Sequence, residues 1–397
     1  MALKDFQRRI DKIALLFERL ISKFHRSYLG FVCLFALIGY AFVFLFPALA
    51  YISFNFIYEI LLDDGAIDWQ QALIWFVVLL FSVQLSYRMF VTRPVPAVGF
   101  TMPESKIPKI YAMVEALQSH FKRPVIYRII ISANYELDIV KTPRWMLPIW
   151  SSNTLVIGLP LLICLSPKQF EYMLARRIGQ FSRRHNILTN WLYQLNGIWK
   201  QYSYIYAKQK SSESWILKLF YRVYANLYER ISVNAARADE LNADEYVMEL
   251  YFHEAVCEMI TADALCRWYL EKRFWPAISK ASSPEAKALI QPYRKLTTAI
   301  RSNLTTAKIA MLNKLVWNEP VERTNRIPSI KLRLDKIGYT APHLKENKGE
   351  SAADFYLGAS LNGALNLMDK LWYKNNLQKL NKKKMTKKRW VPILKNG

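Results

Sequence analysis

Metal-binding residues are scarce in this chain, which has four cysteines and five histidines among 397 residues. No two histidines lie at metal-ligand spacing on one helix, and no C-x-x-C pair occurs. The histidines are His25, His120, His185, His253 and His343, and the cysteines are Cys33, Cys164, Cys257 and Cys266. These absences exclude the common zinc sites that are built from closely spaced ligands. They also predict reduced, mostly buried thiols.

Acidic residues are few as well, since 31 Asp and Glu stand against 55 Lys and Arg and leave a formal net charge of +24. The C-terminal tail is the most basic part, because ten Lys or Arg and no acid follow Asp369. Such a tail is typical of segments that bind anionic lipid headgroups in the membrane. A solvated tail without a partner is one alternative. Nucleic acid is the other, which is disfavoured because no RNA-binding motif accompanies Trp372, Tyr373 and Trp390.

Two apolar segments lie near the N-terminus and predict a transmembrane helical hairpin over residues 28–91. The uncharged runs 27–58 and 69–87 are both long enough to cross a hydrocarbon core of about 30 Å, which needs roughly 20 helical residues. Pro47 lies in the longer run, where we expect it to kink or interrupt the helix. The connector between the runs is acidic, with Glu59, Asp63, Asp64 and Asp68. Because the outer flanks are basic, both termini are predicted to lie in the cytoplasm.

The remaining segments predict an α+β fold that is mostly α. Residues 1–27 alternate basic and apolar residues at helical spacing, typical of an amphipathic helix that lies on headgroups or packs on its own protein. After a proline-punctuated linker over 92–103, a helix is expected over 106–121. Strands are expected over residues 125–132, 136–141 and 154–159, with a loop over 143–153. From residue 166 to about 317 the pattern is helical. A domain over 92–340 is thus followed by a helical extension and basic tail over 341–397.

Residues 165–185, LSPKQFEYMLARRIGQFSRRH, have the layout of a zinc-peptidase active-site helix with the catalytic residues replaced. Such a helix carries H-E-x-x-H, in which the two histidines hold zinc and the glutamate takes a proton from the metal-bound water. The five positions here are Arg176, Arg177, Ile178, Gly179 and Gln180. Arginine stays protonated in proteins, so it neither donates a lone pair to a metal nor accepts a proton. Hydrolysis by the usual route is therefore excluded.

Together with this helix, three later segments resemble the HtpX-like and CAAX-prenyl-protease-like membrane zinc metallopeptidases, which are gluzincins. These segments are ARADELNADEYVMEL at 236–250, RFWPAI at 273–278 and IPSIKLRLDKIGY at 327–339, the last similar to a family stretch T-H-P-S-x-x-x-R-L. The resemblance spans roughly residues 69–340. It implies a zincin-like metallopeptidase domain attached to a multi-pass anchor in the bacterial inner (cytoplasmic) membrane, with the bulk of the chain in the cytoplasm.

The resemblance assigns family roles to individual positions. The first zinc histidine corresponds to Arg176, the general base to Arg177 and the second histidine to Gln180. The third zinc ligand is kept as Glu240, and its acidic neighbour as Asp244. A later histidine corresponds to Ile327. The edge-strand residues that line the substrate cleft correspond to Glu136 and Leu137.

This pattern implies a pseudopeptidase: a catalytically degenerate homologue that has lost zinc, needs no other cofactor and binds an extended polypeptide or another protein partner at the membrane. Two alternatives stay open. One is an active zinc metalloendopeptidase with unusual ligands, such as Glu240 with Asp244 and His253. The other is a basic nucleic-acid adaptor.

Loss of zinc also predicts an ion pair. Removing a dipositive metal from a cleft that keeps Glu240 and Asp244 leaves two carboxylates uncompensated. A guanidinium can bridge carboxylates through parallel hydrogen bonds. We therefore expect Arg176 or Arg177 to pair with Glu240 or Asp244 at about 2.7 to 2.9 Å.

Overall fold

The structure is a computed structural model. It describes residues 25–62, 68–92, 99–121, 126–144, 147–181, 187–208, 215–281, 290–320, 325–346 and 349–389. Within these ranges the fold is mostly helical with one small mixed sheet, as predicted. The predicted amphipathic helix over 1–27 lies almost entirely outside the described residues, as do Asp63, Asp64 and Trp390.

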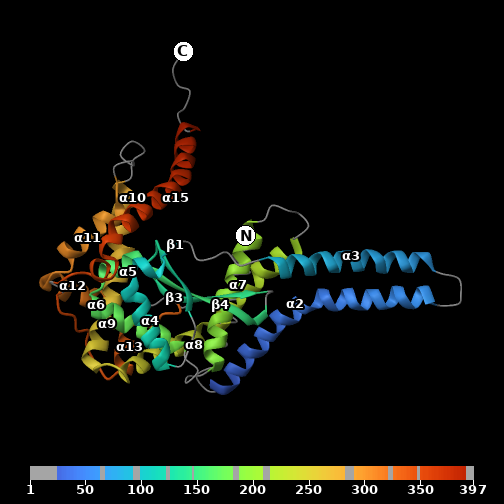
Figure 1. The fold of residues 1–397 in the computed structure, drawn as a ribbon, viewed down its shortest axis with the longest axis horizontal. Coiled ribbons are helices and arrows are strands. Elements are labelled where there is room, and N and C mark those ends of the chain that lie inside the picture. Colours follow the sequence, from blue (N-terminus) through green and yellow to red (C-terminus); the bar gives the residue numbers. More distant parts are fainter. Residues whose placement is uncertain are drawn as a thin grey trace, which may run out of the picture.

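Two helices form the apolar hairpin: α2 (His25–Leu62) and α3 (Trp69–Val91). Both are long and apolar enough to cross a membrane. They lie side by side, and their connected ends extend away from the rest of the molecule (Figure 1). Pro47 lies inside α2 without ending it, so the helix is not interrupted, although it changes direction along its length (Figure 1). Asp68 caps α3 by accepting hydrogen bonds from the backbone N–H groups of Gln70 and Gln71.

The first half of α2 packs against two further helices, α7 (Ile187–Lys208) and α8 (Trp215–Met248). The contact is rich in aromatic rings, among which Tyr224 stacks between Phe35 and Phe220 at centroid distances of 5.2 and 5.0 Å. Gly39 makes this approach feasible, because a Cβ at that position would lie 2.4 Å from the Tyr224 hydroxyl. The hairpin is therefore joined to the body through a packed core of its own.

The sheet has the strand order β1-β2-β4-β3, in which β2 and β4 are parallel and the other pairs antiparallel. The strands are β1 (Gly99–Thr101), β2 (Ile126–Ser132), β3 (Leu137–Arg144) and β4 (Leu147–Gly158). Strand β3 is an edge strand, and Leu137 pairs with Ile157 of β4.

Two predictions in this region are wrong. The expected loop over 143–153 belongs to the β3–β4 hairpin, where Pro143 pairs with Ser151 and Arg144 with Leu147. Proline is tolerated there because β3 is an edge strand, whose outward N–H groups need no ladder partner. The expected linker over 92–103 contains the short strand β1, which pairs with β2.

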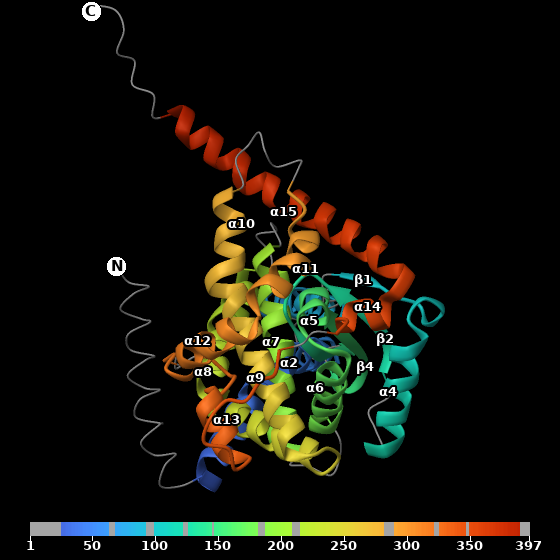
Figure 2. The ribbon, with the colours of Figure 1, turned by 90° about the vertical axis from the view of Figure 1, so that its left-hand side faces the viewer.

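The other helical segments lie around and beside the sheet. In chain order they are η1 (Glu104–Lys106), α4 (Pro108–Phe121), α5 (Leu159–Cys164), α6 (Pro167–Gln180), α9 (His253–Tyr269), η3 (Leu270–Phe274), α10 (Trp275–Ala281), α11 (Pro292–Asn303), α12 (Thr306–Trp317), α13 (Ile330–Lys336), α14 (Ala352–Leu357), η5 (Gly358–Ser360) and α15 (Leu361–Arg389). Helix α15 crosses the molecule against α11 and projects beyond it (Figure 2). It carries the basic run 382–389.

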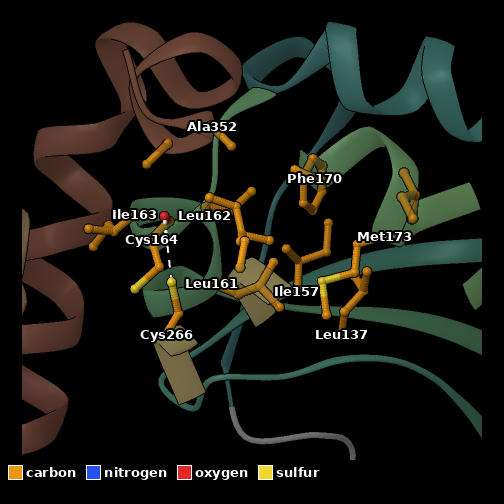
Figure 3. Packing of buried hydrophobic residues seen from close by; sticks show 14 of the residues in the cluster. Leu137, Ile157, Leu161, Leu162, Ile163, Cys164, Phe170, Met173, Cys266 and Ala352 are labelled. Atoms are coloured by element: carbon orange, nitrogen blue, oxygen red, sulfur yellow. Dashed lines mark hydrogen bonds between the residues drawn. The ribbon is translucent and has the colours of Figure 1, made fainter. Parts of the chain in front are cut away.

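A second, larger core lies between the sheet and helices α4, α5, α6 and α9. Side chains of α5 and α6, including Leu161, Phe170 and Met173, meet Leu137 and Ile157 of the sheet (Figure 3). Helix α6 starts at a capping box, in which Ser166 and Gln169 bond to each other's backbone N–H groups.

The cysteines fit the prediction of reduced, mostly buried thiols. All four are free, and Cys164, Cys257 and Cys266 are buried. The Cys266 thiol lies 3.9 Å from the Cys164 carbonyl oxygen (Figure 3). Burial raises the pKa of the Cys164 and Cys257 thiols, so neither has the thiolate character of a reactive cysteine.

Candidate functional site

The site lies where α6 crosses the second half of α8. Arg176 is near the C-terminal end of α6, and Glu240 and Asp244 lie one turn apart on the same face of α8. Helix α8 is continuous, so the element that packs on the hairpin with Tyr224 also carries both carboxylates. All three side chains of the site are at least 95% removed from solvent. The site is therefore part of the protein interior.

Arg176 bridges the two carboxylates of α8. Its Nη2 donates to Glu240 Oε2 at 2.6 Å and to the Glu240 carbonyl oxygen at 2.9 Å, while its Nε donates to Asp244 Oδ1 at 2.6 Å. The predicted ion pair is thereby confirmed, with one arginine contacting both acids. Charge-assisted hydrogen bonds of this kind are short and strong.

A second arginine, Arg333 of α13, completes the environment of Asp244. Its Nε donates to Asp244 Oδ2 and its Nη2 to Asp244 Oδ1, both at 2.9 Å, which is the bidentate geometry that arginine favours. Its Nη1 donates to Asp263 of α9 at 3.3 Å, and Asp263 in turn accepts from Arg267 at 3.2 Å. The buried charges thus form a chain that ties α6, α8, α9 and α13 together.

Sequence reasoning did not identify Arg333, Asp263 or Arg267. The sequence did contain a signal for Arg333, which is the arginine of the IPSIKLRL stretch that resembles T-H-P-S-x-x-x-R-L. Asp263 and Arg267 lie in an apolar helix with no motif. Their spacing of four residues is common on any helix surface, so it carries no signal of a site.

Arg177 and Gln180 extend the network toward the sheet. Arg177 Nη1 donates to Glu240 Oε1 at 3.2 Å and to Gln180 Oε1 at 2.5 Å, and it lies 3.9 Å from Asp138 of the edge strand β3. Gln180 Nε2 donates to Asp239 Oδ2 at 2.7 Å. Arg176, Arg177 and Gln180, the positions that the resemblance assigns to the H-E-x-x-H ligands and base, therefore all contact the acidic segment of α8.

The network sets the protonation states of its members. Burial alone would raise the pKa of Glu240, but the guanidiniums of Arg177 and Arg176 outweigh burial and hold that pKa well below its ordinary value. Asp263 behaves in the same way, because Arg267 and Arg333 outweigh its burial and lower its pKa. Burial alone would lower the pKa of Arg333, but the neighbouring Asp244 carboxylate outweighs burial and raises it. Glu240, Asp263 and Arg333 are therefore ionised at neutral pH.

The other predicted site residues lie at its margins. Glu136 accepts a hydrogen bond from the Ser132 hydroxyl at 2.7 Å, and Leu137 is buried in the sheet core. Ile327 precedes α13 and lines a cavity beside Arg333. His253 begins α9, and the part of the chain that the structure describes contains no group of three His, Cys, Asp or Glu side chains placed to hold a metal. The alternative ligand set of Glu240, Asp244 and His253 is thus not assembled.

Two cavities adjoin the network. The first, of about 530 Å³, is lined by Asp263, Arg333, Ile327 and Trp268 among others. The second, of about 430 Å³, lies toward the β2–β3 turn, where Tyr135, Trp275, Tyr293 and Trp372 form its walls. Arg267 and Glu271 line both cavities, so the two are neighbours.

The lowered pKa of Glu240 predicts a specific loss of stability in acid. A carboxyl group with a depressed folded pKa stabilises the fold above its unfolded pKa of about 4.3, and this contribution is lost as the pH falls from there toward the folded pKa. Glu240→Gln should therefore be less stable than the wild type at pH 7, and the difference should shrink between about pH 5 and pH 3. Urea unfolding of the full-length protein in mild detergent would measure it. A difference that stays constant over this range would contradict the assignment.

Comparison with known proteins adds no relative: no protein-family model matches the chain, and neither the curated proteins nor the solved structures include a significant match to it.

Proposed function

We propose that this chain is a membrane-anchored pseudopeptidase, a zincin-like HtpX-family domain that binds a protein partner and does not hydrolyse it. The observation that supports this most directly is the Arg176 bridge between Glu240 and Asp244. Two guanidiniums of α6, those of Arg176 and Arg177, bring to the carboxylates the same formal charge as one zinc ion. A zinc ion does not fit beside them, because arginine is no ligand and repels a cation.

The proposal places the protein in the bacterial inner membrane. Helices α2 and α3 would form a two-span anchor, with the acidic connector outside and the body in the cytoplasm. The exposed apolar side chains of the hairpin, such as Leu37, Phe54 and Leu73, suit contact with lipid chains. The basic run of α15 would then lie in the cytoplasm, on the side of the membrane whose leaflet carries anionic headgroups.

The proposal predicts a metal-free, inactive protein. Full-length protein purified from native membranes without chelator is expected to hold far less than one zinc per chain, because only Glu240 of the family ligands is present. Elemental analysis measures the metal, and peptide hydrolysis with and without a chelator measures activity. Stoichiometric zinc together with chelator-sensitive hydrolysis would refute the proposal.

The two neighbouring cavities beside the network, here called the groove, are the proposed contact surface for the partner. The groove offers aromatic walls, polar groups and volumes of about 530 and 430 Å³, a combination suited to side chains of an extended polypeptide. A photo-crosslinking amino acid in place of Trp268, inside the groove, should capture a discrete protein in native membranes. The same probe in place of Lys314, an exposed residue of α12 outside the groove, should not. Equal capture at the two positions would mean that the groove is not the contact surface.

A further inference from the structure

A third cavity, of about 740 Å³, lies at the junction of α9 and α10 and shares the lining residue Lys272 with the 530 Å³ cavity. Its walls are the η3 segment Leu270–Phe274, the start of α10, the end of α11 and the first two turns of α12. The η3 segment is a π-helix, a rare geometry that occurs frequently at functional sites. The volume is within the range of small-molecule sites. Neither the charge network nor the proposed function accounts for this cavity.

The charged side chains that line the cavity are all cations: Lys272, Arg273, Lys280 and Lys308. Lys272 pairs with Glu319 at 3.1 Å. Among the residues that the structure describes, no carboxylate pairs with Arg273, Lys280 or Lys308, and Arg273 lies over the Trp268 ring at 5.9 Å. All four cations are exposed at the rim, and among the described residues one carboxylate pairs with them, so the potential at the cavity is positive and favours an anionic ligand.

One cation is held in place by its own hydrogen bonds. Lys308 Nζ donates to Asn303 Oδ1 at 3.1 Å and to the Ser302 carbonyl oxygen at 2.9 Å. Asn303 in turn donates to the Tyr269 hydroxyl at 3.0 Å. These local bonds restrain the exposed Lys308 ammonium group at the wall of the cavity.

The floor of the cavity is apolar. Tyr269, Phe274 and Leu312 are buried there, while Met311 is exposed at the rim. Tyr269 and Phe274 place their ring centroids 6.5 Å apart. A ligand that fits this cavity therefore combines a multiply charged anionic group with an apolar or aromatic part.

The position of the cavity bears on the source of the ligand. Helices α10 and α12 lie at the end of the molecule opposite the free end of the α2–α3 hairpin (Figure 1), and both are in front when that end faces the viewer (Figure 2). If the hairpin crosses the membrane, lipids around it do not reach this end. A soluble ligand is favoured.

We propose that this cavity binds a soluble organic phosphate, whose phosphates contact Lys280, Arg273 and Lys308 and whose apolar or aromatic part rests on Tyr269 and Phe274. A nucleoside diphosphate has this chemistry. The inference is independent of the pseudopeptidase proposal, since no residue of the Arg176 network lines the cavity.

Calorimetric titration of full-length protein in neutral detergent tests the proposal, with ADP and pyrophosphate as probes. One ADP per chain should bind, more tightly than pyrophosphate because of the apolar floor, and the affinity should fall as salt rises. Lys280→Gln and Lys308→Gln should each weaken ADP binding about tenfold or more, the effect of one lost charge-assisted hydrogen bond. Lys314→Gln, an exposed lysine of the same α12 that does not line the cavity, is the matched control and should bind normally.

Several results would overturn the proposal. Absence of binding by both probes would do so, as would equal affinities in Lys280→Gln, Lys308→Gln and the control. Equal affinities for pyrophosphate and ADP would show that Tyr269 and Phe274 do not contact the ligand, which contradicts the proposed binding mode. Binding to vesicles that contain phosphatidylglycerol, without binding of either soluble probe, would assign the cavity to a lipid headgroup and refute the soluble source.

Discussion

Arg176→Ala is expected to lower the free energy of unfolding by about 3 to 5 kcal/mol, because it removes the shortest charge-assisted hydrogen bonds of two buried carboxylates. The side chains of Arg176, Glu240 and Asp244 are only 5%, 4% and 0% exposed, so water cannot replace the lost donors. Asp244 keeps its bidentate bond to Arg333, whereas Glu240 keeps only the single, longer bond from Arg177 at 3.2 Å, so the larger part of the loss should arise at Glu240. Urea unfolding of the full-length protein in mild detergent measures the change.

Arg301→Ala is the matched control for this prediction. Arg301 pairs with Asp354 at 3.4 Å, but the two side chains are 71% and 37% exposed. An exposed pair contributes under about 1 kcal/mol, because water and salt screen it. If Arg176→Ala costs no more than Arg301→Ala, the buried network does not stabilise the fold as we infer.

The sequence contains the information for this ion pair only in combination with the family resemblance. Arg176 and Glu240 are 64 residues apart, and no local pattern connects them. The resemblance places them around one metal position, and electrostatics then requires a cation beside the two retained acids. Local sequence rules were sufficient to predict where α6 begins, because Ser166, Pro167 and Gln169 form a standard helix N-terminus.

The parts that the sequence did not predict depend on contacts between distant segments. Arg333 and Asp263 join the network across 89 and 70 residues, and neither interaction has a periodic signal. Strand β1 has only three residues, too few for an alternating pattern, and it exists because β2 offers it an edge. Pro143 indicated a loop, whereas its position on the edge strand β3 allows the hairpin to continue.

A reverse substitution tests the zincin-like framework itself. The triple variant Arg176→His, Arg177→Glu and Gln180→His restores the H-E-x-x-H pattern, with two imidazoles four residues apart on one helix face. Glu240 is in position to be the third ligand, since Arg176 Nη2 lies 2.6 Å from its Oε2. Position 180 faces the same carboxylate, because Gln180 Oε1 and Glu240 Oε1 both contact Arg177 Nη1, at 2.5 and 3.2 Å.

We expect this triple variant to bind about one zinc per chain, as three protein ligands and a water complete a tetrahedral catalytic-type site. The variant lacks the Arg176 bridge, so it should be destabilised without metal and recover with it. At a free zinc concentration 1,000 times the dissociation constant, binding adds about 4 kcal/mol to the free energy of unfolding. Elemental analysis after dialysis and thermal unfolding with and without zinc measure the two effects.

Addition of Glu240→Gln to the triple variant is the control, because it removes the third ligand and leaves both imidazoles. Zinc affinity should then fall by an order of magnitude or more, and the stabilisation by zinc should largely disappear. A triple variant that is folded by circular dichroism yet binds no zinc would contradict the framework. In that case α6 and α8 would not present positions 176, 180 and 240 to a common point, and the Arg176 bridge would be an ordinary buried ion pair with no relation to a metal site.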